Sequence, residues 1–77
     1  MISYQEAYKK VDAFYRRNKL DGIRVAGDAG EEWIFQAKTK EDLNPVLVNK
    51  ETGSLHPCRI YIPEERQLMY SAKVIET

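Results

Sequence analysis

The sequence has few of the residues that build disulfide-bonded or membrane-spanning proteins. Cys58 is its only cysteine, so no disulfide can form within the chain, and a reducing compartment is the expected setting. No apolar run approaches the roughly 20 residues that cross a bilayer. The N-terminal stretch MISYQEAYKK lacks a basic segment followed by an apolar one, so we expect no signal peptide. These absences predict a cytoplasmic protein that has no contact with a membrane.

The chain also has no excess of charge of either sign. Its 12 basic side chains balance 12 acidic ones, whereas a protein that binds nucleic acid usually presents a strongly basic face. A mild asymmetry remains, because residues 1–24 hold six basic and three acidic side chains, which leaves six basic and nine acidic ones for the rest. We therefore expect no nucleic-acid partner and a weak acidic bias after residue 24.

Residues that could perform catalysis or bind a metal are scarce. His56 and Cys58 are one residue apart, but a zinc site needs about four ligands, and no second cluster supplies the others. A Cys–His nucleophile also needs a cleft and an oxyanion hole, so we expect a histidine near a turn and a small buried thiol instead. Three pairs of adjacent acidic residues are interpreted as solvated charges: Glu31 with Glu32, Glu41 with Asp42, and Glu64 with Glu65. The sequence thus predicts no enzymatic activity, no cofactor and no metal.

The N-terminal segment predicts an amphipathic helix. Ser3 and Glu6 have the spacing of a capping box, in which each side chain bonds the backbone of the other residue. From Tyr4 to Tyr15 the apolar side chains recur at helical spacing and occupy one arc. The helix is expected to end near residues 18–21, with Gly22 in the usual stop position.

Short extended segments follow and predict an antiparallel sheet. Residues 23–25 and 33–36 are separated by turn residues at 27–30, and Trp33 and Phe35 share one face of the second segment. A third strand follows Pro45, and a turn that contains Gly53 leads to a fourth extended segment. We expect three or four strands, with one face of the sheet packed on the N-terminal helix in two layers.

The C-terminal segment, residues 64–75, fits two interpretations. Pro63-Glu64-Glu65 is typical of a helix start, but apolar side chains alternate along the segment as they would in a strand. We favour a short C-terminal helix. On that helix Tyr70 and Val74 lie one turn apart on the polar side, a pair that fits either a contact with a partner or the ordinary exposure of single apolar residues. The 77 residues are thus expected to form a single small α+β domain.

Several of these stretches together resemble one known family. They are MISYQEAYKKVDAFY, the Trp33-Ile34-Phe35 strand, the stretch NPVLVNKETGSLH that ends at His56, and the Pro63-Glu64-Glu65 helix start. Together they are similar to the YrhB-like domain, which is also classified as immunity protein thirty-five of bacterial polymorphic toxin systems. The chain departs from the family where Glu41-Asp42-Leu43 replaces a common glycine, and in the residues after His56.

The resemblance implies a non-enzymatic protein that binds and neutralises a toxin. The alternative is a small chaperone-like stress protein that binds unfolded clients. The family offers no catalytic residues, and the expected partner contacts are Glu31, Glu32, Glu41, Asp42, Tyr61, Tyr70 and Val74. Acidic side chains among them would steer a basic toxin. An edge strand of so small a sheet could also pair with a second copy, which leaves a homodimer open.

Overall fold

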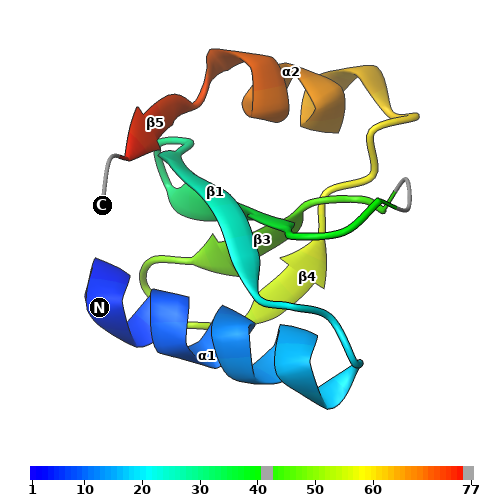
Figure 1. The fold of residues 1–77 in the computed structure, drawn as a ribbon. Coiled ribbons are helices and arrows are strands. Elements are labelled where there is room, and N and C mark those ends of the chain that lie inside the picture. Colours follow the sequence, from blue (N-terminus) through cyan, green and yellow to red (C-terminus); the bar gives the residue numbers. More distant parts are fainter. Residues whose placement is uncertain (41–42, 76–77) are drawn as a thin grey trace.

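A computed structural model describes residues 1–40 and 43–75 and shows a single antiparallel sheet between two helices (Figure 1). The fold is α+β. Its elements in chain order are α1 (Tyr4–Arg17), β1 (Ile23–Asp28), β2 (Glu32–Ala37), β3 (Val46–Asn49), β4 (Leu55–Pro57), α2 (Pro63–Ser71) and β5 (Lys73–Ile75). The strand order is β4-β3-β2-β1-β5, so β4 and β5 form the two edges. The described residues therefore contain five strands, where the sequence predicted three or four.

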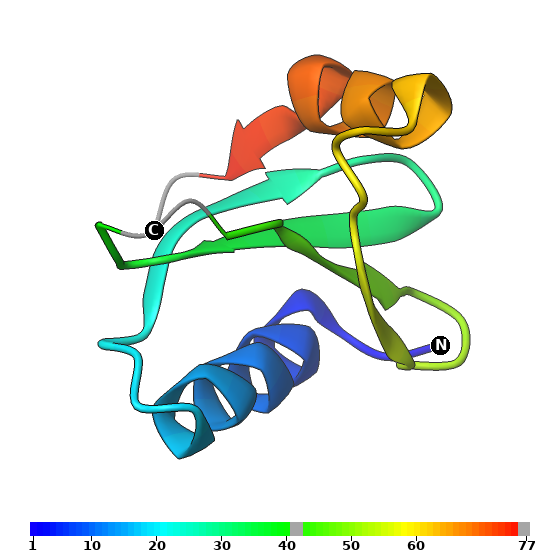
Figure 2. The same ribbon diagram turned by 90° about the vertical axis from the view of Figure 1, so that its right-hand side faces the viewer.

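The sheet carries a helix on each face, so the prediction of two layers is wrong. Figure 2 shows α1 on one side of the sheet and α2 on the other. Phe35 and Val48 pack with α1, whereas Ile34 and Leu47 pack with α2. Successive residues of a strand point to opposite faces, and a strand covered on both faces therefore needs a continuous apolar run. This requirement explains the uninterrupted apolar residues of β3.

The N-terminus of α1 confirms the predicted capping box. The Ser3 hydroxyl accepts a hydrogen bond of 3.1 Å from the Glu6 amide, and the Glu6 carboxylate accepts one of 3.5 Å from the Ser3 amide. The far end of α1 stops earlier than predicted. Lys19, at φ 64°, provides the left-handed residue, and the Leu20 amide donates to the Tyr15 carbonyl at 2.9 Å. This is a Schellman motif, so the prediction that Gly22 stops the helix is wrong.

The C-terminal segment combines both interpretations of the sequence. Pro63 begins α2 as predicted, but the helix ends at Ser71 and the chain turns into β5. The expectation that Val74 continues the helix one turn after Tyr70 is therefore wrong, because Val74 pairs with Gly27 on β1. Gly27 permits this approach, since a Cβ there would lie 3.2 Å from the Lys73 carbonyl oxygen.

In the described ranges, 1–40 and 43–75, no helix is long and apolar enough to cross a bilayer.

Candidate protein-binding surface

Three of the predicted contact residues are large, apolar and exposed. Tyr61 lies in the connection before α2 and is 72% exposed, and Tyr70 lies on α2 and is 71% exposed. Val74 lies on β5 and is 67% exposed. All three come from the segment that covers and borders one side of the sheet. We call these three side chains the α2–β5 surface.

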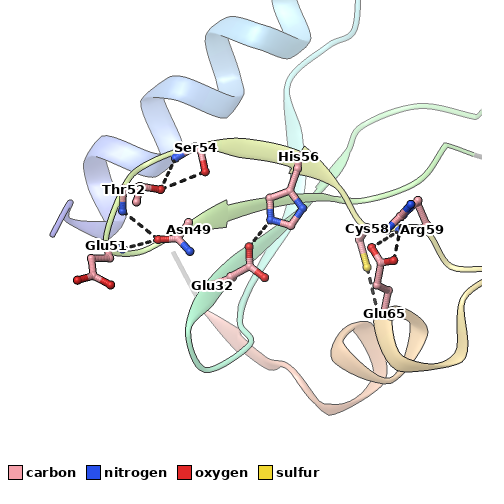
Figure 3. Close-up of polar contacts among 9 residues, drawn as sticks. All are labelled: Glu32, Asn49, Glu51, Thr52, Ser54, His56, Cys58, Arg59 and Glu65. Carbon is pink, nitrogen blue, oxygen red and sulfur yellow. Dashed lines mark hydrogen bonds and ion pairs between the residues drawn. The ribbon is translucent and has the colours of Figure 1, made fainter.

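The predicted acidic contacts do not form one exposed group. Glu31 is exposed in the connection between β1 and β2. Glu32 is the first residue of β2, and its carboxylate contacts the ring of His56 on β4 (Figure 3). Glu41 and Asp42 lie outside the described residues. Of the two acids that the structure describes, Glu31 is exposed and Glu32 is partly buried.

The contact between Glu32 and His56 crosses the strand that lies between them. Leu47 of β3 pairs with His56, and Asn49 of β3 pairs with Glu32. The two side chains therefore meet on the α2 side of the sheet, and their contact ties the edge strand β4 to the interior strand β2. No signal in the sequence relates them, because they are 24 residues apart and meet only through the register of three strands.

Cys58 is a buried structural thiol, as the sequence predicted. Its side chain has no exposed surface and packs with Ile34 and Leu47, and the thiol donates to the Glu65 carbonyl at 3.2 Å. Burial raises the pKa of the Cys58 thiol, and the nearby carboxylates of Glu65 and Glu32 raise it further. The thiolate is the reactive form of cysteine, so these surroundings oppose a nucleophilic role.

The imidazole of His56 is directed at Glu32, and the thiol of Cys58 is directed at α2 (Figure 3). The two groups are thus committed to different partners. Within the part of the chain that the structure describes, no group of three or more His, Cys, Asp or Glu side chains could hold a metal ion.

A second polar contact that the sequence does not reveal joins two turns. Lys50 follows β3, and its ammonium lies 2.8 Å from the Asp28 carboxylate at the end of β1. The same ammonium lies 5.2 Å from the centroid of the Trp33 ring, within the range of a cation–π contact. Hydrogen bonds from Lys50 and from the Gly30 amide lower the pKa of Asp28. The ion pair between Lys50 and Asp28 thus joins the turn after β3 to the end of β1, near Glu31.

Comparison of the chain with protein-family models, with curated proteins and with solved structures found no match. The resemblance to the YrhB-like domain therefore depends on the sequence stretches quoted above. A functional proposal for the chain depends on its exposed surface.

Proposed function

We propose that the protein is a non-enzymatic binding module that neutralises a bacterial toxin in the cytoplasm by covering the toxin's functional surface. The α2–β5 surface is the observation that carries this proposal. Exposed aromatic and apolar side chains oppose solubility, and they are enriched at the centres of protein interfaces. Tyrosine is a frequent hot-spot residue, because it buries a large area and has few side-chain torsions to fix.

The frame beneath this surface favours binding by occlusion. Both faces of the sheet are covered, and α2 packs through Leu68 and Met69 onto the core of Ile34, Leu47 and Cys58. A surface held on packed elements loses little conformational entropy when it binds, which leaves more of the contact energy for affinity. The proposal needs no catalytic residue, since an occluding protein acts by its shape.

Charge supports a basic partner only in part. Glu31 is exposed and would attract a basic toxin and speed association. Glu32 contributes less, because His56 occupies its carboxylate. The exposed tyrosines therefore carry more of the expected affinity than the acidic side chains do.

The test is co-expression of the protein with the toxin-like product of the neighbouring reading frame. We expect the two proteins to co-purify and the cells to survive. Replacing Tyr61 and Tyr70 together by glutamate should reduce protection at least tenfold and leave the melting temperature unchanged, because both side chains are exposed. Phe14→Ser is the matched control, since Phe14 is an exposed aromatic on α1, across the sheet.

Two outcomes would remove the proposal. One is a toxin-like neighbour that neither binds the protein nor loses toxicity. The other is a protein that suppresses the aggregation of a denatured client, such as heated citrate synthase, without any effect on the toxin. That second result would favour the chaperone-like alternative.

A further inference from the structure

The two helices are held on the sheet to different degrees. α1 contributes three buried side chains to the core, Ala7, Val11 and Tyr15, whereas none of the nine residues of α2 is buried. α1 also begins with a capping box, whereas Ile62, the residue before α2, makes no side-chain hydrogen bond to its helix. Regions that bury little apolar surface open at a lower free energy than the rest of a protein. Of the two helices, α2 should therefore separate from the sheet more easily.

The contact between α2 and the sheet is small and apolar. Leu68 and Met69 are only partly buried where they pack on Ile34, Leu47 and Cys58. Within the residues that the structure describes, no hydrogen bond joins α2 directly to a strand. A helix of nine residues is marginal on its own in water, so α2 keeps its form only while this contact holds it.

Glu65 fastens the first turn of α2 to the connection that precedes the helix (Figure 3). Its carboxylate accepts a hydrogen bond of 3.2 Å from the Arg59 amide and one of 3.0 Å from the Arg59 guanidinium. Its carbonyl accepts from the Cys58 thiol at 3.2 Å. Across the described part of the chain, the side-chain hydrogen bonds and ion pairs that join α2 to other segments all involve Glu65. The polar attachment of α2 is thus concentrated at one residue.

We propose that α2 is a lid that opens while α1 and strands β1 to β4 stay folded, and that Glu65 is its latch. The closed form presents Tyr70, which is 71% exposed on α2. The open form presents Ile34, Leu47 and Cys58, which the closed form buries. The lid thus exchanges one apolar surface for another. This proposal goes beyond the proposed function and does not depend on it, because the closed form is the major one and keeps the α2–β5 surface on its frame.

The urea dependence of thiol reactivity distinguishes lid opening from global unfolding. Cys58 reports the opening, because its side chain has no exposed surface and packs beneath α2. The measurement is its rate of reaction with Ellman's reagent at low urea, compared with the unfolding constant from the fluorescence of Trp33, which packs on the α1 side. The dependence on urea scales with the surface exposed, so the logarithm of the rate should rise with less than about half the slope of the unfolding constant. Equal slopes would overturn the proposal.

A matched pair of variants tests the latch. Glu65→Gln keeps the backbone carbonyl and removes the charge that Arg59 contacts, so it should raise the thiol rate at least about threefold. Glu64→Gln is the control, because Glu64 is an exposed acid in the same first turn. Its thiol rate should stay within about twofold of the unchanged protein, since it contacts no residue of the connection. Equal rates for the two variants would remove Glu65 as the latch.

A second pair of variants tests whether the α1 side stays folded. Tyr15→Phe removes a hydrogen bond between α1 and the Phe35 carbonyl, so it should raise the unfolding constant about fivefold and leave the thiol rate unchanged. Leu68→Ala removes part of the contact beneath α2 and should raise the thiol rate at least about fivefold. A Tyr15→Phe thiol rate that rose by the same factor as the unfolding constant would overturn the lid, as would an unchanged rate for Leu68→Ala.

Discussion

The ammonium of Lys50 lies 2.8 Å from the carboxylate of Asp28, so the turn after β3 is fixed to the end of β1. The Lys50 hydrogen bond lowers the pKa of Asp28, and the Gly30 amide, 2.9 Å from the same carboxylate, lowers it further. A group whose pKa is lower in the folded state stabilises the fold above its unfolded pKa. That contribution is lost as the pH falls through the folded pKa.

We therefore expect Asp28→Asn to lower the free energy of unfolding at neutral pH and to have little effect in acid. The Asp28 side chain is 45% exposed, so solvent screening limits the loss to about 0.5 kcal/mol. Thermal melts at pH 7 and at about pH 2, below the usual range of aspartate, measure the difference. Lys50→Met also removes the cation above Trp33 at every pH, so its effect should shrink in acid without disappearing. If Asp28→Asn lowered the melting temperature by the same amount at both pH values, that result would contradict the linkage.

Much of the fold could be predicted because its signals are local. The capping box at Ser3, the aromatic face of β2, and the strand and turn from Pro45 to Gly53 each depend on neighbouring residues, and the structure contains all of them. The segment after Ser71 could not be decided locally, because its pattern fits a helix and a strand. The segment after Ser71 becomes a strand because Val74 pairs with the outer edge of β1, which is distant in sequence.

The candidate surface could be predicted only in part, for the same physical reason. Exposure of Tyr70 follows from its neighbours in sequence, which supply the polar face of α2, whereas Tyr61 lies in the connection before that helix. The engagement of Glu32 by His56 depends on the register of β2, β3 and β4, and no local pattern encodes a register between distant strands.

Gly53 occupies a position that other residues should not tolerate. Its φ is 77°, and a Cβ there would lie 3.0 Å from the Lys10 ammonium and 3.3 Å from Ile2. Lys10 cannot easily move away, because it donates to the Gly53 carbonyl at 2.9 Å. We expect Gly53→Ala to lower the free energy of unfolding by roughly 1–2 kcal/mol for the left-handed backbone, with a further loss for the contacts.

Gly30→Ala is the matched control for this prediction. Gly30 also has a positive φ, 90°, but nothing lies within 4 Å of its ideal Cβ position. Urea unfolding should therefore give a larger loss for Gly53→Ala than for Gly30→Ala, and the difference measures the contacts with Lys10 and Ile2. Equal losses would mean that the crowding around Gly53 has no energetic effect.

Loss of the hydroxyl should have different effects on the free energy of unfolding at two tyrosines of α1. The Tyr4 hydroxyl is buried and has no hydrogen-bond partner in the described residues, whereas the Tyr15 hydroxyl donates to the Phe35 carbonyl at 3.1 Å. Tyr4→Phe keeps the ring, which stacks on Phe35 with a centroid distance of 6.0 Å, and removes an unsatisfied polar group. We expect Tyr4→Phe to be neutral or stabilising, and Tyr15→Phe to cost about 1 kcal/mol. Urea unfolding of both variants provides the comparison, and a larger loss for Tyr4→Phe would contradict it.

The thiol of Cys58 should be unreactive in the folded protein. It is fully buried, and its raised pKa leaves little thiolate at neutral pH. We expect its reaction with Ellman's reagent at pH 7 to be at least about tenfold slower in buffer than in urea above the unfolding midpoint, because both access and thiolate fraction control the rate. A folded-state rate equal to the rate in urea would show an accessible thiol.

Cys58→Ser should also retain protection in the co-expression assay, provided that it remains folded, because occlusion needs no nucleophile. A folded Cys58→Ser protein without protection would point to chemistry at this residue.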